Sequence, residues 1–223
     1  MRFWYKALSI VWKDTVSELR TKEIIFSVLV FTLLVVVIFN FAFSGSQDRI
    51  ETMASGILWV TFTFAGVLSL GRLFVTEKEH GCLEGLMICP IGREVIFVGK
   101  MLTILIFMLI IEGISLPIFA LLNNLSVFSF QLIVIIFLTT VGFAAVGTLF
   151  SALSVNTKAR EMVLPILFLP IVIPLLVSAV RASEQALSGE SWSNMSTSLQ
   201  IIGAFDVIFV VVTFLIFSFV IEE

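Results

Sequence analysis

The sequence predicts an all-α integral membrane protein with six transmembrane helices and both chain ends in the cytoplasm. The chain has 223 residues, is 59% hydrophobic and only 13% charged, and is too apolar to cover a soluble core. Six apolar runs approach or reach the roughly 20 residues that cross a hydrocarbon layer of about 30 Å. Of the thirteen Lys and Arg residues, only Arg49 and Arg181 fall in the three alternate loops. Because Lys and Arg stay on the cytoplasmic side, this bias predicts the orientation.

The six apolar runs make up most of the chain. The predicted spans are residues 24–43, 53–70, 101–122, 130–153, 163–180 and 201–221. We therefore expect a single transmembrane domain over residues 1–223, with no soluble catalytic domain. The loops predicted to face outward, at 44–52, 123–129 and 181–200, are too short to fold as a receptor domain.

The residues ahead of the first span, 1–23, predict an amphipathic helix that lies on the inner membrane surface. Its apolar face is formed by residues at helical spacing: Trp4, Leu8, Val11, Trp12, Thr15 and Leu19. Its basic face carries Arg2, Lys6, Lys13 and Arg20. Tryptophans beside basic residues suit the lipid headgroup boundary. The helix either has a role of its own or only anchors the chain.

The fifth span contains three prolines, Pro165, Pro170 and Pro174. Each proline removes a backbone donor and crowds the preceding turn, so we expect this helix to be kinked or locally unwound. A broken helix often lines a cavity in a transporter, which makes Pro170 and Pro174 candidate functional positions. A static kink used only for packing is the alternative.

Two acidic residues fall inside predicted spans, Glu112 in the third and Asp206 near the outer end of the sixth. An ionised carboxylate inside a membrane costs about 2.5 to 3.5 kcal/mol or more. Glu112 should therefore face protein or water, or be protonated. It is either a functional residue or one half of a hydrogen bond between helices. Asp206 either has a function or reaches the outer headgroups.

No pattern predicts an enzyme, a metal site or a bound cofactor in this chain. His80 is the single histidine, and Cys82 and Cys89 match no zinc spacing. Gly99-Lys100 lacks the other residues of a phosphate-binding loop. We expect no ATP hydrolysis by this chain, so the energy must come from an ion gradient or from a partner.

The predicted cytoplasmic loop between the second and third spans contains a short amphipathic segment. Cys82, Leu83, Leu86 and Met87 form one apolar face, bounded by Gly81 and stopped at Pro90. Such a helix lies on a membrane or inserts into a groove on a partner.

This loop resembles the coupling-helix loop of ABC-2-type exporter permeases. The resemblance rests on Arg72-Leu73-Phe74, then Gly81-x-Leu83-Glu84-x-Leu86-Met87-x-x-Pro90, then Gly99-Lys100. Within that group the chain is most similar to the heme exporter protein B family, CcmB, of the bacterial cytochrome c maturation system. Two further stretches match, Gly56-Ile57-Leu58-Trp59-Val60 and Leu169-Pro170-x-x-Ile173-Pro174-Leu175-Leu176. Gly71 departs from the pattern, because some relatives carry an acidic residue there.

The resemblance implies a permease of the bacterial inner (cytoplasmic) membrane. It would work with an ATP-binding subunit, CcmA, in two copies each, beside CcmC and CcmD, and release the heme-loaded periplasmic chaperone CcmE. ATP would bind to the partner, and heme would be the cargo.

The resemblance also implies which residues contact the ATPase. These coupling residues are Arg72, Glu77, Gly81, Leu83, Glu84, Leu86, Met87 and Pro90. Leu83, Leu86 and Met87 would be the apolar anchors, and Glu84 would be a polar contact. Three other hypotheses stay open: an ABC-2 exporter of a lipid, glycan or drug, an ion-coupled carrier that uses Glu112, and a scaffold that transports nothing.

Overall fold

Every element in the described part of the chain is an α-helix. The computed structural model describes residues 2–21, 23–43, 47–72, 92–123, 129–155 and 160–220. The helices are α1 (Arg2–Thr21), α2 (Glu23–Phe43), α3 (Gln47–Arg72), α6 (Arg93–Asn123), α7 (Phe130–Val155), α8 (Arg160–Leu187) and α9 (Trp192–Val220). The predicted all-α class is confirmed.

Five of these helices are long and apolar enough to cross a membrane. Their spanning stretches are Met53–Gly71, Arg93–Leu122, Phe130–Ser154, Val163–Leu187 and Trp192–Phe217. In α2 the apolar stretch is shorter, from Phe26 to Ala42. The chain is a multi-pass membrane protein. A sixth span through α2, and the orientation of the bundle, stay predictions.

Helix α7 packs against α3, α6, α8 and α9, and its spanning stretch is the most buried of the five. Small residues on α7 let its neighbours approach closely. At Gly142 and Gly147, a Cβ atom would overlap Asp206 of α9 and Leu70 of α3 respectively. Between them, the Phe143 ring packs edge-on against Phe168 of α8, with 4.7 Å between the ring centroids. These close contacts fix how α3, α8 and α9 sit on α7.

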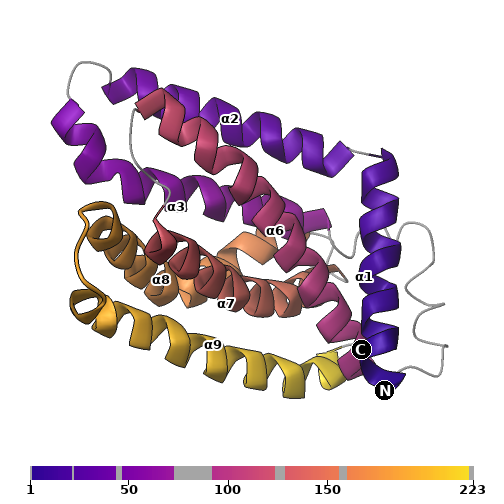
Figure 1. The fold of residues 1–223 in the computed structure, drawn as a ribbon. Helices are drawn as coiled ribbons and strands as arrows, with labels where there is room; N and C mark the ends of the chain where they lie inside the picture. The colour runs from indigo at the N-terminus through magenta and orange to yellow at the C-terminus, as the bar shows by residue number, and fades with distance from the viewer. Residues whose placement is uncertain are drawn as a thin grey trace.

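Helix α1 lies across one end of the bundle, at a steep angle to the other helices (Figure 1). Both ends of the chain lie at this end. The predicted N-terminal helix is therefore present, but only part of its predicted apolar face is free. Ala7, Ile10 and Val11 are buried, and α1 packs mainly on α6.

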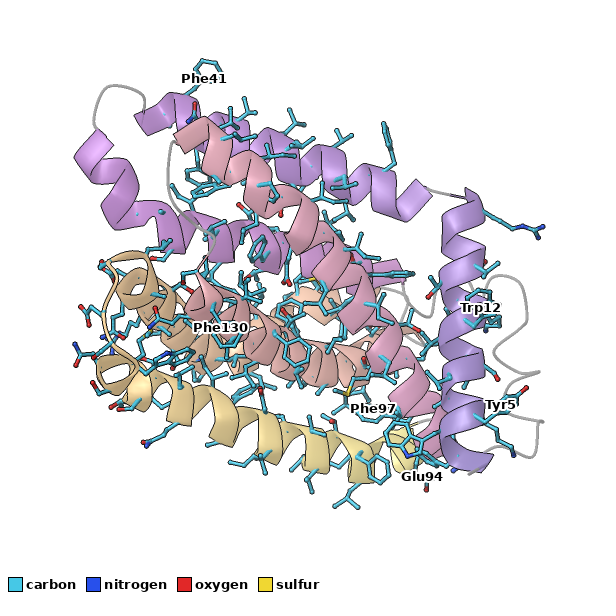
Figure 2. All side chains as sticks on the ribbon, viewed as in Figure 1. Tyr5, Trp12, Phe41, Glu94, Phe97 and Phe130 are labelled. Carbon is cyan, nitrogen blue, oxygen red and sulfur yellow. The ribbon has the colours of Figure 1, made fainter. Side chains whose placement is uncertain are left out.

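The exposed side of α1 carries large aromatic and apolar side chains. Trp4 is 62% exposed, Leu8 57% and Trp12 74%. Figure 2 shows Tyr5 and Trp12 on the outer side of the helix, away from the bundle. The sequence pattern placed Val11 in one face with these residues. The structure separates them, because Val11 turns toward the protein.

The predicted loop at residues 181–200 is much shorter in the structure. Helix α8 continues through Arg181 to Leu187, and α9 already begins at Trp192. A Schellman turn ends α8: Gly189 N–H donates to Ala186 O at 3.2 Å, and Glu190 N–H donates to Gln185 O at 3.0 Å. Gly189 adopts φ of 73°, a left-handed conformation that favours glycine. The polar residues of this region extend the two helices, and α9 begins nine residues before the predicted start of the sixth span at residue 201, which stays a prediction.

Candidate functional site

The described part of the proposed coupling region consists of the two helices that flank it. Glu77, Gly81, Leu83, Glu84, Leu86, Met87 and Pro90 lie outside the described residues. Arg72 is the last residue of α3, and Arg93 is the first residue of α6. We define the C-terminal end of α3 and the N-terminal end of α6 as the loop anchors.

The first loop anchor is attached to α7. Leu70 is fully buried and fills the space above Gly147 of α7. The Ser151 hydroxyl of α7 donates a hydrogen bond to the Leu70 carbonyl oxygen at 2.7 Å. That carbonyl is in the last turn of α3, where backbone acceptors lack partners inside the helix. Helix α3 therefore ends in a fixed position against α7.

The second loop anchor is attached to α1 and α9. Phe97 is buried, and its ring centroid lies 5.1 Å from that of Phe217 and 6.3 Å from that of Phe214, both on α9. Figure 2 shows Phe97 where α6 meets α1 and α9. Gly99 of α6 faces Ile10 of α1, and a Cβ there would lie 2.9 Å from the Ile10 Cβ. The start of α6 is therefore packed on two sides.

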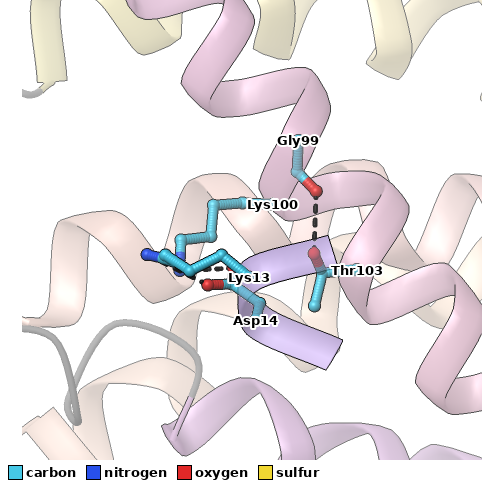
Figure 3. A network of polar contacts seen from close by, with 5 residues as sticks. All are labelled: Lys13, Asp14, Gly99, Lys100 and Thr103. Atoms are coloured by element: carbon cyan, nitrogen blue, oxygen red, sulfur yellow. Dashed lines mark hydrogen bonds and ion pairs between the residues drawn. The ribbon is translucent and has the colours of Figure 1, made fainter. Parts of the chain in front are cut away.

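An ion pair joins α1 to α6 beside this packing (Figure 3). The Lys100 ammonium lies 2.8 Å from Asp14 Oδ2, and the Lys100 side chain is only 2% exposed. Lys13, which is 48% exposed, approaches the other oxygen of Asp14 at 3.1 Å. One turn after Gly99 on α6, the Thr103 hydroxyl donates a hydrogen bond to the Gly99 carbonyl oxygen at 2.9 Å. Sequence reasoning missed this pair, because 86 residues separate Asp14 from Lys100 and Asp14 sits among basic residues.

Glu112 is buried between α6 and α7, with 2% of its surface exposed. Thr140 Oγ1 of α7 lies 3.0 and 3.1 Å from its two carboxyl oxygens. A narrow cavity adjoins Glu112 and is lined by aromatic residues such as Trp59 and Phe143, and it has no room for a water molecule. Glu112 therefore faces protein, one of the two surroundings the sequence predicts.

Asp206 is buried in the middle of α9, not near its end. The residue is 8% exposed and follows Trp192, the start of the helix, by fourteen positions. Its carboxyl group occupies the space above Gly142 of α7. The expectation that Asp206 reaches the headgroups assumed a later helix start. Glu112 and Asp206 contact α7 at different places, and no described contact brings them together.

Helix α8 stays helical through its three prolines. Pro170 and Pro174 are exposed on the outer surface of α8, beside exposed Ile173. The Ser178 hydroxyl donates to the Pro174 carbonyl at 2.9 Å. Local unwinding is therefore absent, and these two prolines do not line the cavity beside Glu112.

In the described part of the chain, no three His, Cys, Asp or Glu side chains come together as potential metal ligands. His80, Cys82 and Cys89 fall outside that part. The arrangement therefore consists of two loop anchors, one ion pair and two separate buried acids.

The comparisons with known proteins agree on one family. The family described as CcmB protein matches residues 5–222. The chain is 32% identical over 162 residues to heme exporter protein B of Rhodobacter capsulatus, covering 72% of this chain and 74% of that protein. It is 28% identical to heme exporter protein B of Pseudomonas aeruginosa, covering 72% and 73%. For the Haemophilus influenzae protein of the same name, identity is 28% over 184 residues, or 80% and 81% of the two chains. The sequence match from Tyr5 to Glu222, on a bundle of apolar helices, shows that the chain belongs to the CcmB family.

Proposed function

We propose that this chain is a transmembrane subunit of a heme-export complex in the bacterial inner membrane, and that a separate CcmA-like subunit hydrolyses ATP. The observation that carries the proposal is the family match over residues 5–222, together with similarity to proteins named heme exporter protein B. The long apolar helices support the membrane location.

The packing of the loop anchors supports a mechanical role. The undescribed segment 73–91 joins α3 to α6, and both ends of it are fixed to other helices. Leu70 and Ser151 fix the first end to α7, while Phe97 and Lys100 fix the second end to α9 and α1. A force applied to the segment would therefore pass to α1, α7 and α9 rather than move a free loop. We propose that the ATPase applies this force.

We propose heme as the substrate of the complex and no resident cofactor in this chain. The work of the subunit would be heme export or the release of a heme-loaded periplasmic chaperone, CcmE-like, beside CcmC- and CcmD-like membrane proteins. Two copies of the chain would serve one complex. An ABC-2 exporter of a lipid, glycan or drug would share this architecture. Deleting the gene separates the two, because loss of c-type cytochromes is expected only for heme export.

An ion-coupled carrier that uses Glu112 is less well supported. The carboxyl already contacts Thr140, and the adjoining cavity has no room for water. Proton exchange across a membrane needs a path of water or ionisable groups to the site. The contacts of Glu112 instead support a hydrogen bond between α6 and α7.

The test is to purify the tagged protein in mild detergent and identify its partners by mass spectrometry. The variant carries Leu83→Asp and Leu86→Asp, which would place charges in the ATPase groove. The control is Ser188→Asp, an exposed position in the turn between α8 and α9. We expect an ATP-binding subunit with the wild type and the control, and its loss with the double variant. If the ATPase co-purifies equally with all three proteins, the docking role is wrong. If it is absent from all three, ATP coupling is wrong.

A further inference from the structure

Asp206 lies at a junction of three helices. Its Oδ1 atom fills the space where a Cβ would stand on Gly142 of α7. Phe205 of α9 and Leu175 of α8 approach the same point at 3.1 and 3.2 Å. Asp206 follows Trp192 by fourteen positions, which corresponds to about 21 Å of helix at 1.5 Å per residue. The carboxyl group is therefore deep in the spanning part of α9 and enclosed by apolar side chains and backbone.

Both oxygens of this carboxyl group lack a hydrogen-bond partner among the described residues. The hydroxyl of Thr139 is also buried and without a partner there. Thr139 precedes Gly142 by three positions, so the two residues share a face of α7. Unsatisfied polar groups are therefore present on both α7 and α9, which is uncommon for buried side chains.

The described surroundings provide no positive charge for Asp206. Asp206 is the only ionisable residue of α9, and α7 has none. The other helices packed on α9 carry the ionisable residues Arg93, Glu94, Lys100, Glu112, Arg160, Glu161, Arg181 and Glu184. Of these, Lys100 pairs with Asp14 and Glu112 contacts Thr140, whereas Arg181 and Glu184 are exposed. Among the described residues, no side chain pairs with the Asp206 carboxyl group.

An ionised carboxylate without a hydrogen-bond partner or a cation among the described residues is costly in such a place. We propose that Asp206 is a proton-binding site of the bundle, occupied in this packed state, so that the side chain is a neutral carboxylic acid. Its ligand is a proton. Loss of the proton would put an uncompensated charge between α7, α8 and α9, and the junction would have to admit water or a cation. Proton binding is thereby linked to the packing of α9.

Infrared difference spectroscopy of the full-length protein in lipid nanodiscs tests this proposal directly. The spectra of wild type and Asp206→Asn are compared at neutral pH. Asp206→Ala provides the same comparison without an amide at the junction. This variant replaces Asp206→Asn in the experiment if Asp206→Asn does not fold. We expect each variant to lose a carboxylic-acid C=O stretching band and no carboxylate band. The control is Glu184→Gln, an exposed acid on α8, which should lose carboxylate bands.

Reversible binding is tested by raising the pH in steps while the protein stays folded. We expect the Asp206 acid band to disappear at alkaline pH, with a larger fall in the unfolding midpoint of the wild type than of Asp206→Asn. Loss of carboxylate bands in Asp206→Asn at neutral pH would show that Asp206 is ionised and would overturn the proposal. An acid band that persists at every pH would overturn reversible binding, and equal pH profiles for the two proteins would overturn its link to packing.

Discussion

Thr139 and Thr140 are neighbours on α7 whose hydroxyl groups have different surroundings. Thr140 Oγ1 lies 2.7 Å from the Ile136 carbonyl oxygen and 3.0 Å from Glu112 Oε1. Thr139 Oγ1 is buried without a partner among the described residues. A hydroxyl carries one hydrogen, so Thr140 donates to one of its two neighbours at a time. Glu112 thus depends on a hydroxyl that the backbone also uses.

This contrast allows a matched test with the isosteric change of threonine to valine. Thr140→Val removes the described side-chain partner of Glu112, so we expect a loss of about 1 kcal/mol in the free energy of unfolding. Thr139→Val removes an unsatisfied hydroxyl, so we expect no loss. Denaturation in detergent micelles measures both. Equal effects of the two changes would show that the contact with Glu112 contributes little.

Sequence reasoning could find Glu112 but not its partner. A carboxyl group in an apolar run is visible from composition alone, whereas Thr140 is 28 residues away on another helix. Lys100 shows the same limit. It is a charged residue near the start of a predicted span, and its burial depends on Asp14 of α1. Such pairs form only when the helices pack.

Helix α1 and the start of α6 form one packed unit, and the pair of Asp14 with Lys100 is a polar contact within it. Gly99 lets Ile10 approach the α6 backbone, and the ion pair lies beside this contact. Without Lys100, the largely buried Asp14 would be paired only with half-exposed Lys13, and breaking a buried pair typically costs about 3 to 5 kcal/mol. The attachment of α1 should therefore be sensitive to Lys100.

We expect Lys100→Met to lower the free energy of unfolding by about 3 kcal/mol and to make α1 accessible to protease. Lys13→Met is the control, because Lys13 is half exposed and an exposed ion pair contributes little. Adding Asp14→Leu to Lys100→Met should restore much of the stability, since no buried charge remains. Denaturation and limited proteolysis in detergent measure these effects. If Lys13→Met destabilises the protein as much as Lys100→Met, Lys100 is not the main contact.

At the scale of the whole molecule, the charge distribution predicts which loops face the cytoplasm. The test replaces Cys82 and Cys89 with serine and introduces single cysteines at Ser46, His80 and Glu190. In intact cells, we expect a membrane-impermeant maleimide to label positions 46 and 190. Position 80 should react only after the membrane is permeabilised so that the reagent reaches the cytoplasm. Reaction of position 80 from outside would overturn the orientation, and failure of position 46 together with labelling of 190 would argue against a span through α2.

Six span boundaries stay predictions from the sequence alone, whereas the predicted helical class and multi-pass membrane setting are confirmed. These follow from runs of apolar residues, and such runs are local properties of the chain. The sequence also identified Glu112 and Asp206 as unusual, because a carboxyl group in an apolar run is costly wherever it lies.

Only the tertiary structure decided which groups those residues meet. It turned Val11 toward the protein and away from Trp12, moved the start of α9 to Trp192, and placed Asp206 against Gly142. The positions of Val11 and Asp206 depend on contacts between segments far apart in the chain, whereas α9 begins just after the local turn at Gly189. The physical reason is that helix packing is set by side-chain shape and close approach, and neither is contained in the hydrophobic pattern of one segment.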